Sequence, residues 1–229
     1  DYSNELLNKQ FDTKSLKGFG ILDLQEGVVA AGVALHYLNE TKHQKTKHIL
    51  NISRIHKDHY VWMDRFTIRN LELFSSTNEG AVTLIDVLDN TKSPMGGRML
   101  RRWLALPLKD VNHIKLRHQI VDEIFSDDVI TDLLIKEIRA IGDLERLISK
   151  VATLRINPRE CFRLKDALLS LKPIKNLCNI TNVNALRDIL NKIDLCGSII
   201  SKIETEISDD PPLLVHKGNV IKTGFNKEL

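Results

Sequence analysis

The sequence has 229 residues, 42% of them hydrophobic and 28% charged, so the chain can bury a core and wholesale disorder is excluded. It has 33 basic and 30 acidic residues, and this near balance argues against a surface built mainly to grip nucleic acid. No apolar run approaches the roughly 18 residues that a membrane helix needs, so we expect a soluble, cytoplasmic protein without membrane contact.

Residues 1–47 predict a polar helix, a turn at residues 18–20 and a second helix. Apolar residues of the second helix recur every three or four positions, as one buried face requires; they are Leu24, Val28, Ala31, Leu35 and Leu38. Gly27 and Gly32 weaken this helix slightly but permit close packing against a neighbour. Residues 48–63 change character, and their aromatic and β-branched run predicts one or two short strands.

From Asp64 onward the pattern is helical almost to the end. A short amphipathic element follows Asp64, and another runs from Leu84 to about Asn90. Ser93 and Pro94 form a good helix start, because Ser caps free amides and Pro fits the first turn.

Four more helices are expected to start near Asp110, Asp127, Gly142 and Asn157, the last of them closing at Pro173. Residues 181–195 and 198–207 complete the set, and Gly218 to Gly224 brackets the entry to a strand without a visible partner. The predicted fold class is therefore mainly α, a multi-helix bundle with a few short strands near residues 48–63 and 218–225.

We interpret the helix that starts at Pro94 as a structural junction. Gly96 and Gly97 are poor interior helix residues, so something must come close to the backbone there. Met95 and Trp103 lie on the apolar face of this helix, and Trp103 is expected to fill the core. A fully buried Trp103 would make Trp103→Ala cost about 3–5 kcal/mol.

Arg98, Arg101 and Arg102 occupy the other faces of the same helix. They could make weak contacts with the phosphates of DNA, but the balanced net charge favours an ion-paired or solvated face. Asp143 and Glu145 stand at a predicted helix start, where acidic residues complement the helix dipole, so helix capping is preferred to acid–base chemistry.

The sequence contains no phosphate-binding loop and no GxGxxG, HExxH or GxSxG motif. We therefore expect no catalytic residue, no bound cofactor and no enzymatic activity in this chain itself. Five histidines fall at spacings that match no metal-ligand pattern, so a solvated polar face is preferred; they are His36, His43, His48, His56 and His59. Cys161, Cys178 and Cys196 are widely spaced and are expected to be free thiols.

Several strings, taken together and in order, resemble the MutS family of DNA mismatch-recognition ATPases. The first block holds Met63-Asp64 and residues 67–73, and the second holds residues 86–89 with Pro94-Met95-Gly96 and residues 98–108. Further blocks are residues 142–147 with Asn157-Pro158-Arg159, and Pro211-Pro212 with residues 218–226. Residues 10–32 resemble the end of the connector domain that precedes the core of such proteins.

The resemblance implies that residues 1–47 are the tail of the connector, 48–217 the first half of the helical core or lever domain, and 218–229 the start of the clamp insertion. The chain has no initial Met and ends directly after a motif, so we expect it to be part of a larger protein. The mismatch-reading domain and the ATPase that binds ATP and Mg²⁺ would lie outside it.

The implied role is to couple the ATPase state to DNA clamping without catalysis. In the parent protein the partners would be mismatched duplex DNA, at the bacterial nucleoid, and a second MutS subunit, while this chain alone would bind DNA weakly or not at all. Two alternatives remain open: a helical scaffold that docks proteins, and the core of a MutS-like paralogue that acts outside mismatch repair.

Overall fold

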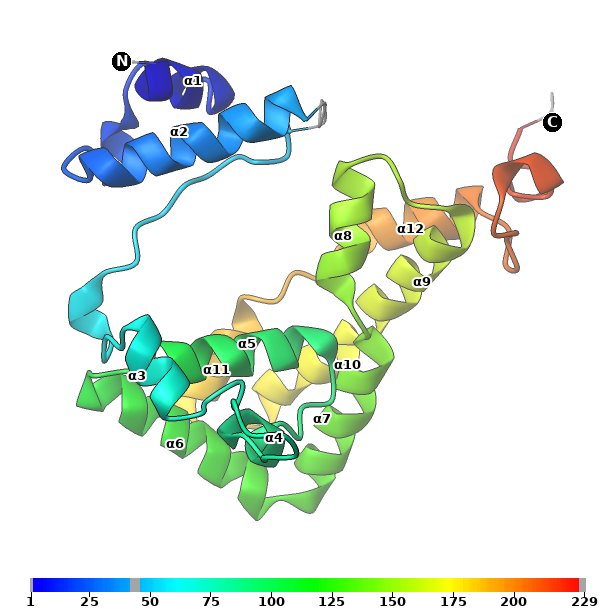
Figure 1. The fold of residues 1–229 in the computed structure, drawn as a ribbon. Coiled ribbons are helices and arrows are strands. Elements are labelled where there is room, and N and C mark those ends of the chain that lie inside the picture. Colours follow the sequence, from blue (N-terminus) through cyan, green and yellow to red (C-terminus); the bar gives the residue numbers. More distant parts are fainter. Residues whose placement is uncertain (1, 42–45, 227–229) are drawn as a thin grey trace. The chain divides into compact units, whose positions relative to one another are not determined.

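The computed structural model describes residues 2–41 and 46–226, and these are mainly helical, as the sequence predicts (Figure 1). The chain divides into two compact units. The first consists of residues 1–56 and 149–155, and the second consists of residues 57–148 and 156–229. Each unit has a hydrophobic core of its own.

The first unit is built on two helices joined by residues 11–24, which contain a short 3₁₀ helix. Its elements are α1 (Tyr2–Gln10), η1 (Leu16–Phe19) and α2 (Gln25–Glu40). Its buried residues come from all three elements and from the loop before α2, and they are Leu7, Leu16, Ile21, Val28 and Leu35. Gly32 of α2 lies directly against Ser3 of α1, so the glycine does allow the close approach that the sequence predicts.

The second unit begins with three short elements, and capping side chains set the starts of the second and third. They are η2 (Lys57–His59), α3 (Arg65–Asn70) and α4 (Leu84–Leu88). The Asp64 side chain accepts a hydrogen bond of 2.7 Å from the backbone N–H of Thr67. Thr83 and Asp86 form a reciprocal capping box at α4, which occupies free N–H groups at that helix start.

The remaining helices follow, and four of the longer ones begin directly after a predicted capping residue. They are α5 (Pro94–Ala105), α6 (Val111–Ser126), α7 (Asp128–Ile141), α8 (Leu144–Ala152), α9 (Pro158–Leu169), α10 (Leu171–Asn176), η3 (Leu177–Asn179), α11 (Asn184–Asn191), α12 (Gly197–Glu206) and η4 (Val215–Lys217). The side chains of Asp110, Asp127 and Asn157 accept hydrogen bonds from the first turns of α6, α7 and α9. These three starts are therefore confirmed.

The core of the second unit lies between α7, α9, α10 and α11. Its buried residues are Ile130, Ile141, Ala167, Ile174, Leu177, Leu186 and Leu190. Met95 of α5 and Ile120 and Ile124 of α6 pack against this cluster from its edge. Helices α5 and α6 thus contribute only part of their apolar faces to the core.

The expected strands near residues 48–63 and 218–225 are reduced to single β-bridges within the described ranges. Tyr60 pairs with Leu108. The pairing stays short because only a few extended residues lie between the end of η2 and the start of α3. Ile221 pairs with Ile207, so the C-terminal segment does have a partner, contrary to the sequence-based expectation. Gly218 and Gly224, both with positive φ, bound this extended stretch and keep it short.

The sequence predicts that Pro173 ends α9, and this prediction is wrong. Helix α9 ends at Leu169, and Pro173 lies in the first turn of α10, which begins at Leu171. A proline is tolerated there because the N–H groups of a first turn have no partner inside the helix. The proline was therefore interpreted as a stop where it belongs to a start.

Candidate functional site

The first turn of α5 is fixed by its own side chains and by the loop before it. The hydroxyl of Ser93 accepts a hydrogen bond of 3.1 Å from the N–H of Gly96, and Pro94 follows as the first helical residue. Asp89 accepts bonds of 2.6 Å and 3.2 Å from the hydroxyl and N–H of Thr91. These hydrogen bonds lower the pKa of the Asp89 carboxyl, the side-chain bond most strongly.

This loop is what comes close to Gly96 and Gly97. A Cβ atom on Gly96 would lie 3.3 Å from the Cβ of Thr91, and one on Gly97 would lie 3.4 Å from the Thr91 hydroxyl and 3.5 Å from a carboxylate oxygen of Asp89. The two glycines therefore make room for residues 89–91 of the same segment. The sequence predicts a close approach at these glycines, and the structure shows that the preceding loop makes it.

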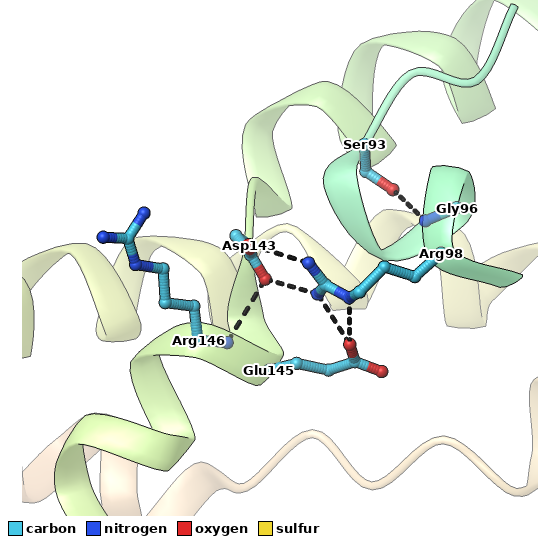
Figure 2. Close-up of polar contacts among 6 residues, drawn as sticks. All are labelled: Ser93, Gly96, Arg98, Asp143, Glu145 and Arg146. Atoms are coloured by element: carbon cyan, nitrogen blue, oxygen red, sulfur yellow. Dashed lines mark hydrogen bonds and ion pairs between the residues drawn. The ribbon is translucent and has the colours of Figure 1, made fainter. Parts of the chain in front are cut away.

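Arg98 connects α5 to the start of α8, although the two are far apart in sequence (Figure 2). Its Nη1 and Nη2 atoms donate to the two carboxylate oxygens of Asp143 at 3.1 Å and 2.7 Å. Its Nε and Nη2 atoms also donate to one oxygen of Glu145, at 2.9 Å and 2.6 Å. One planar guanidinium thus holds two carboxylates, a geometry that lysine cannot reproduce.

Asp143 accepts hydrogen bonds from both α5 and α8. Besides binding Arg98, it accepts a hydrogen bond of 3.2 Å from the backbone N–H of Arg146, in the manner of a helix cap (Figure 2). The Arg98 hydrogen bonds are the main reason that the pKa of the Asp143 carboxyl lies below its usual value, and they raise the pKa of Arg98. Gly142, with φ of 63°, makes the turn between α7 and α8.

Arg101 and Arg102 have different surroundings from Arg98. The charge of Arg101 contributes to lowering the pKa values of Asp86 and Asp89, after the hydrogen bonds that those carboxyls accept. Arg102 is exposed and has no carboxylate within ion-pair distance in the part of the chain that the structure describes. Of the three arginines proposed to contact DNA, Arg98 is thus ion-paired with carboxylates of this chain, whereas Arg102 can contact a bound anion.

The expected burial of Trp103 is wrong. Its side chain is 43% exposed, and the guanidinium of Arg117 from α6 lies 3.7 Å from the centre of its ring. Trp103 instead forms part of the wall of a surface hollow of about 540 Å³, together with Tyr60, Met99, Arg102 and Arg117. Helical periodicity placed it correctly on the apolar face of α5, but the neighbouring helices do not cover that part of the face.

A partly buried polar network around Glu123 of α6 is not predicted by the sequence. Glu123 accepts hydrogen bonds from the hydroxyl of Thr181, which is 1% exposed, and from the N–H of Asn182 at 2.9 Å. Arg187 of α11 donates to the carbonyl of Thr181 at 2.6 Å. In the sequence, only the polar Thr181-Asn182 pair before α11 hints at this network. Its acidic partner cannot be found from local sequence, because Glu123 lies 58 residues away.

The remaining sequence-based candidates form no site among the described residues. No group of three His, Cys, Asp or Glu residues there could hold a metal ion, and His43 lies outside that range. His36 instead shares a hydrogen bond of 3.0 Å with the Tyr2 hydroxyl. Cys161, Cys178 and Cys196 are free thiols. Within the described ranges no helix is long and apolar enough to cross a lipid bilayer.

The comparison with protein families decides the identity of this helical arrangement. The model of MutS domain III matches residues 66–227, which include α5, the Arg98 cluster and the whole core of the second unit. The chain belongs to the MutS family. Its mainly helical fold and its sequence both agree with MutS domain III.

Full-length relatives extend the similarity over the whole chain. The chain is 53% identical over 229 residues to the DNA mismatch repair protein MutS of Christiangramia forsetii, and 51% identical over 229 residues to that of Flavobacterium johnsoniae. It is 48% identical over 227 residues to the MutS of Phocaeicola vulgatus, which covers 99% of the chain. Each alignment covers 26% of the relative, so the chain spans about a quarter of the length of these MutS proteins.

The chain is thus similar to about a quarter of the length of proteins named DNA mismatch repair protein MutS. All three carry the mismatch-repair name, which favours that branch over the paralogue that acts outside repair. The MutS domain III match begins at residue 66, so residues 1–56 of the first unit and the η2 turn lie before it, whereas residues 149–155 of that unit lie within it. Within domain III, the ion-paired Arg98 cluster and the open hollow beside Trp103 are the two features that we consider further.

Proposed function

We propose that this chain is a mechanical part of a MutS protein, which transmits the state of an ATPase located elsewhere in the protein to a clamp that holds DNA. The family match and the mismatch-repair name of the relatives support this role. The chain itself catalyses no reaction, and ATP and Mg²⁺ bind outside it. Mismatched duplex DNA and a second MutS subunit are partners of the whole protein.

In this proposal the chain has three functional segments. Residues 1–47 form the tail of the connector, 48–217 the first half of the core or lever, and 218–229 the start of the clamp insertion. The cores of the two units lie within the first two segments, and the bridge between Ile207 and Ile221 joins the second to the third. The segment that would begin the clamp is therefore hydrogen-bonded directly to the end of the helical part.

The single observation that carries the proposal is the attachment of α5 to α8 through Arg98. A part that transmits motion needs joints that keep a fixed geometry, because a close-packed structure moves between discrete arrangements rather than bending smoothly. Arg98 donates four hydrogen bonds to Asp143 and Glu145, and Asp143 is itself held by the backbone of α8. The start of α8 therefore cannot turn away from α5 without breaking several charge-assisted bonds.

The test uses a full-length MutS protein that contains this chain. We expect Arg98→Gln to leave ATP hydrolysis and mismatch binding within about twofold of the parent, and to change the rate of ATP-triggered release from a mismatched duplex by about tenfold. Arg139→Gln, on exposed residue 139 of α7, is the matched control and should change neither. If Arg98→Gln alters all three measurements equally, or none of them, the joint does not transmit the ATPase state.

A further inference from the structure

Beyond this coupling role, we propose that the hollow between α5, α6 and the turn at residues 57–60 binds single-stranded nucleic acid. The hollow has a volume of about 540 Å³, within the range of ordinary ligand sites. Positively charged residues and an exposed indole ring line it, and two of its arginines have no carboxylate partner among the described residues.

Basic residues outnumber acidic ones along α5 and the first part of α6, and three of them, Arg98, Arg102 and Arg117, line the hollow together with the acidic Glu145. Residues 94–120 contain six basic residues and one acidic residue, whereas the whole chain contains 33 and 30. The near balance of the chain therefore conceals a local excess of positive charge on α5 and the first part of α6. A surface of this kind attracts polyanions, and it does so most strongly at low salt.

Two guanidinium groups in the hollow are free to bind an anion. Arg102 and Arg117 both line it, and neither has a carboxylate within ion-pair distance among residues 2–41 and 46–226. Arg98 also borders the hollow, but Asp143 and Glu145 already hold it. Phosphate contacts are thus assigned to Arg102 and Arg117, and Arg98 is left with its structural role.

Aromatic rings beside these arginines select the kind of polyanion. The indole of Trp103 is 43% exposed and already carries the Arg117 guanidinium on one face, at 3.7 Å from the ring centre. Tyr60 lines the same hollow. Two residues further along, Trp62 is 55% exposed, with the Lys57 ammonium 4.8 Å from its ring centre.

Stacking explains why a single strand is preferred. Bases stack on aromatic rings and on guanidinium planes, but only when they are not already stacked inside a duplex. The exposed indole of Trp103, next to Arg117 and in the same hollow as Arg102, therefore matches an unpaired strand better than a duplex. An acidic protein segment would pair with the charges of Arg102 and Arg117 but would not stack on the indole of Trp103.

The experiment measures quenching of Trp103 fluorescence in the 229-residue chain carrying Trp62→Phe, which leaves Trp103 as its only tryptophan. The probe is an oligothymidylate of about 16 nucleotides, the upper end of ordinary site sizes. We expect saturable quenching, and a logarithmic dependence of affinity on salt with a slope of about −0.7 for each phosphate contact. A duplex of the same length should bind at least about fivefold more weakly.

Matched variants locate the site. Arg102→Ala should weaken binding and reduce the salt slope by about 0.7, whereas Arg163→Ala, at an exposed arginine of α9, should change neither. By fluorescence anisotropy of a labelled oligothymidylate, Trp103→Ala should weaken binding about tenfold, and Trp103→Phe should restore most of it. Thermal melts establish that each variant is folded.

Three results would overturn the assignment. An Arg102→Ala variant that binds as the parent does would remove the hollow from the interaction. Equal affinity for duplex and single strand would mean that phosphates alone are bound. Poly-glutamate that binds as tightly as the oligonucleotide at equal charge would point to an acidic protein segment.

Discussion

The Cβ atom of Ser3 lies 2.4 Å from the position that a Cβ atom on Gly32 would occupy. Helices α1 and α2 therefore meet with no space for a side chain at this position of α2. The backbone of α1 also takes part, because the Cα of Ser3 lies 2.8 Å from the same point. Since backbone atoms cannot rotate out of the way as a flexible side chain can, any residue larger than glycine must push the two helices apart.

Gly32→Ala should accordingly destabilise the first unit by about 1–3 kcal/mol, in spite of the better helix propensity of alanine. Gly27→Ala on the same helix is the control. A Cβ atom there would lie 3.4 Å from the Cβ of Leu24, so the substitution should be neutral or stabilise the unit by up to about 1 kcal/mol. Urea denaturation of both variants tests the pair, and equal stabilities would contradict the close contact.

A second prediction concerns the half-buried carboxylate of Glu123, which binds the buried Thr181. Glu123→Ala leaves the hydroxyl of Thr181 and the N–H of Asn182 without their acceptor. Because Thr181 is almost fully buried, water cannot easily replace the lost bond, and the cost should be about 1–3 kcal/mol. Denaturation midpoints give the measurement.

Asp122→Ala is the matched control, because Asp122 is the exposed neighbour on the same helix. Its effect should stay within about 0.5 kcal/mol. The double variant Glu123→Ala with Thr181→Val should recover part of the loss, since neither partner is then left unsatisfied. A double variant that loses the sum of both single effects would show that the two groups act independently.

The third prediction is a pH dependence. The Arg98 hydrogen bonds hold the pKa of Asp143 below its usual value of 3.8, so the folded state stabilises the carboxylate. This contribution is fully present well above pH 3.8 and is lost as the pH falls through the lower pKa of the folded state. Asp143→Asn should therefore be less stable than the parent at neutral pH, and the difference should shrink as the pH falls below about 4.

Asn is a good helix cap, so Asp143→Asn separates the ion pair from the capping bond to Arg146. Asp143→Ala removes both and should cost about 1 kcal/mol more than the Asn variant at every pH. Thermal melts from about pH 3 to 7 provide the data. A difference between parent and Asp143→Asn that does not change with pH would mean that the Arg98 pair contributes nothing measurable.

The helices of this protein could be located from the sequence because their starts are encoded locally. Ser93, Asp110 and Asn157 were expected to open helices, and each one does accept a hydrogen bond from a first-turn N–H group. A capping residue acts within three positions of itself, so no tertiary information is needed. Pro173 shows the limit, since the same residue suits both the end of one helix and the first turn of the next.

The partners of the polar side chains could not be predicted in the same way. Arg98 binds carboxylates 45 and 47 residues further along the chain, and these were interpreted only as capping residues. Periodicity identified the apolar face of α5, and Met95 on that face does pack against the core. It could not reveal that Trp103, two turns later, lies beyond the reach of the covering helices.

The exposure of Trp103 leads to the last prediction. A fully buried tryptophan loses about 3–5 kcal/mol on truncation to alanine, but this one keeps 43% of its surface in solvent. Its remaining contacts are the wall of the hollow and the cation of Arg117, which is worth about 0.5–1 kcal/mol at an exposed site. Trp103→Ala should therefore cost about 1–2 kcal/mol, measured by urea denaturation.

Leu168→Ala of α9 gives the comparison, because Leu168 is 6% exposed and lies inside the second unit. It should cost about 2–5 kcal/mol. Arg117→Gln should remove the cation from the indole and lower the cost of Trp103→Ala in the double variant by about 0.5 kcal/mol. A loss at Trp103 as large as that at Leu168 would require a covered indole, and it would also take away the exposed ring on which the nucleic-acid proposal depends.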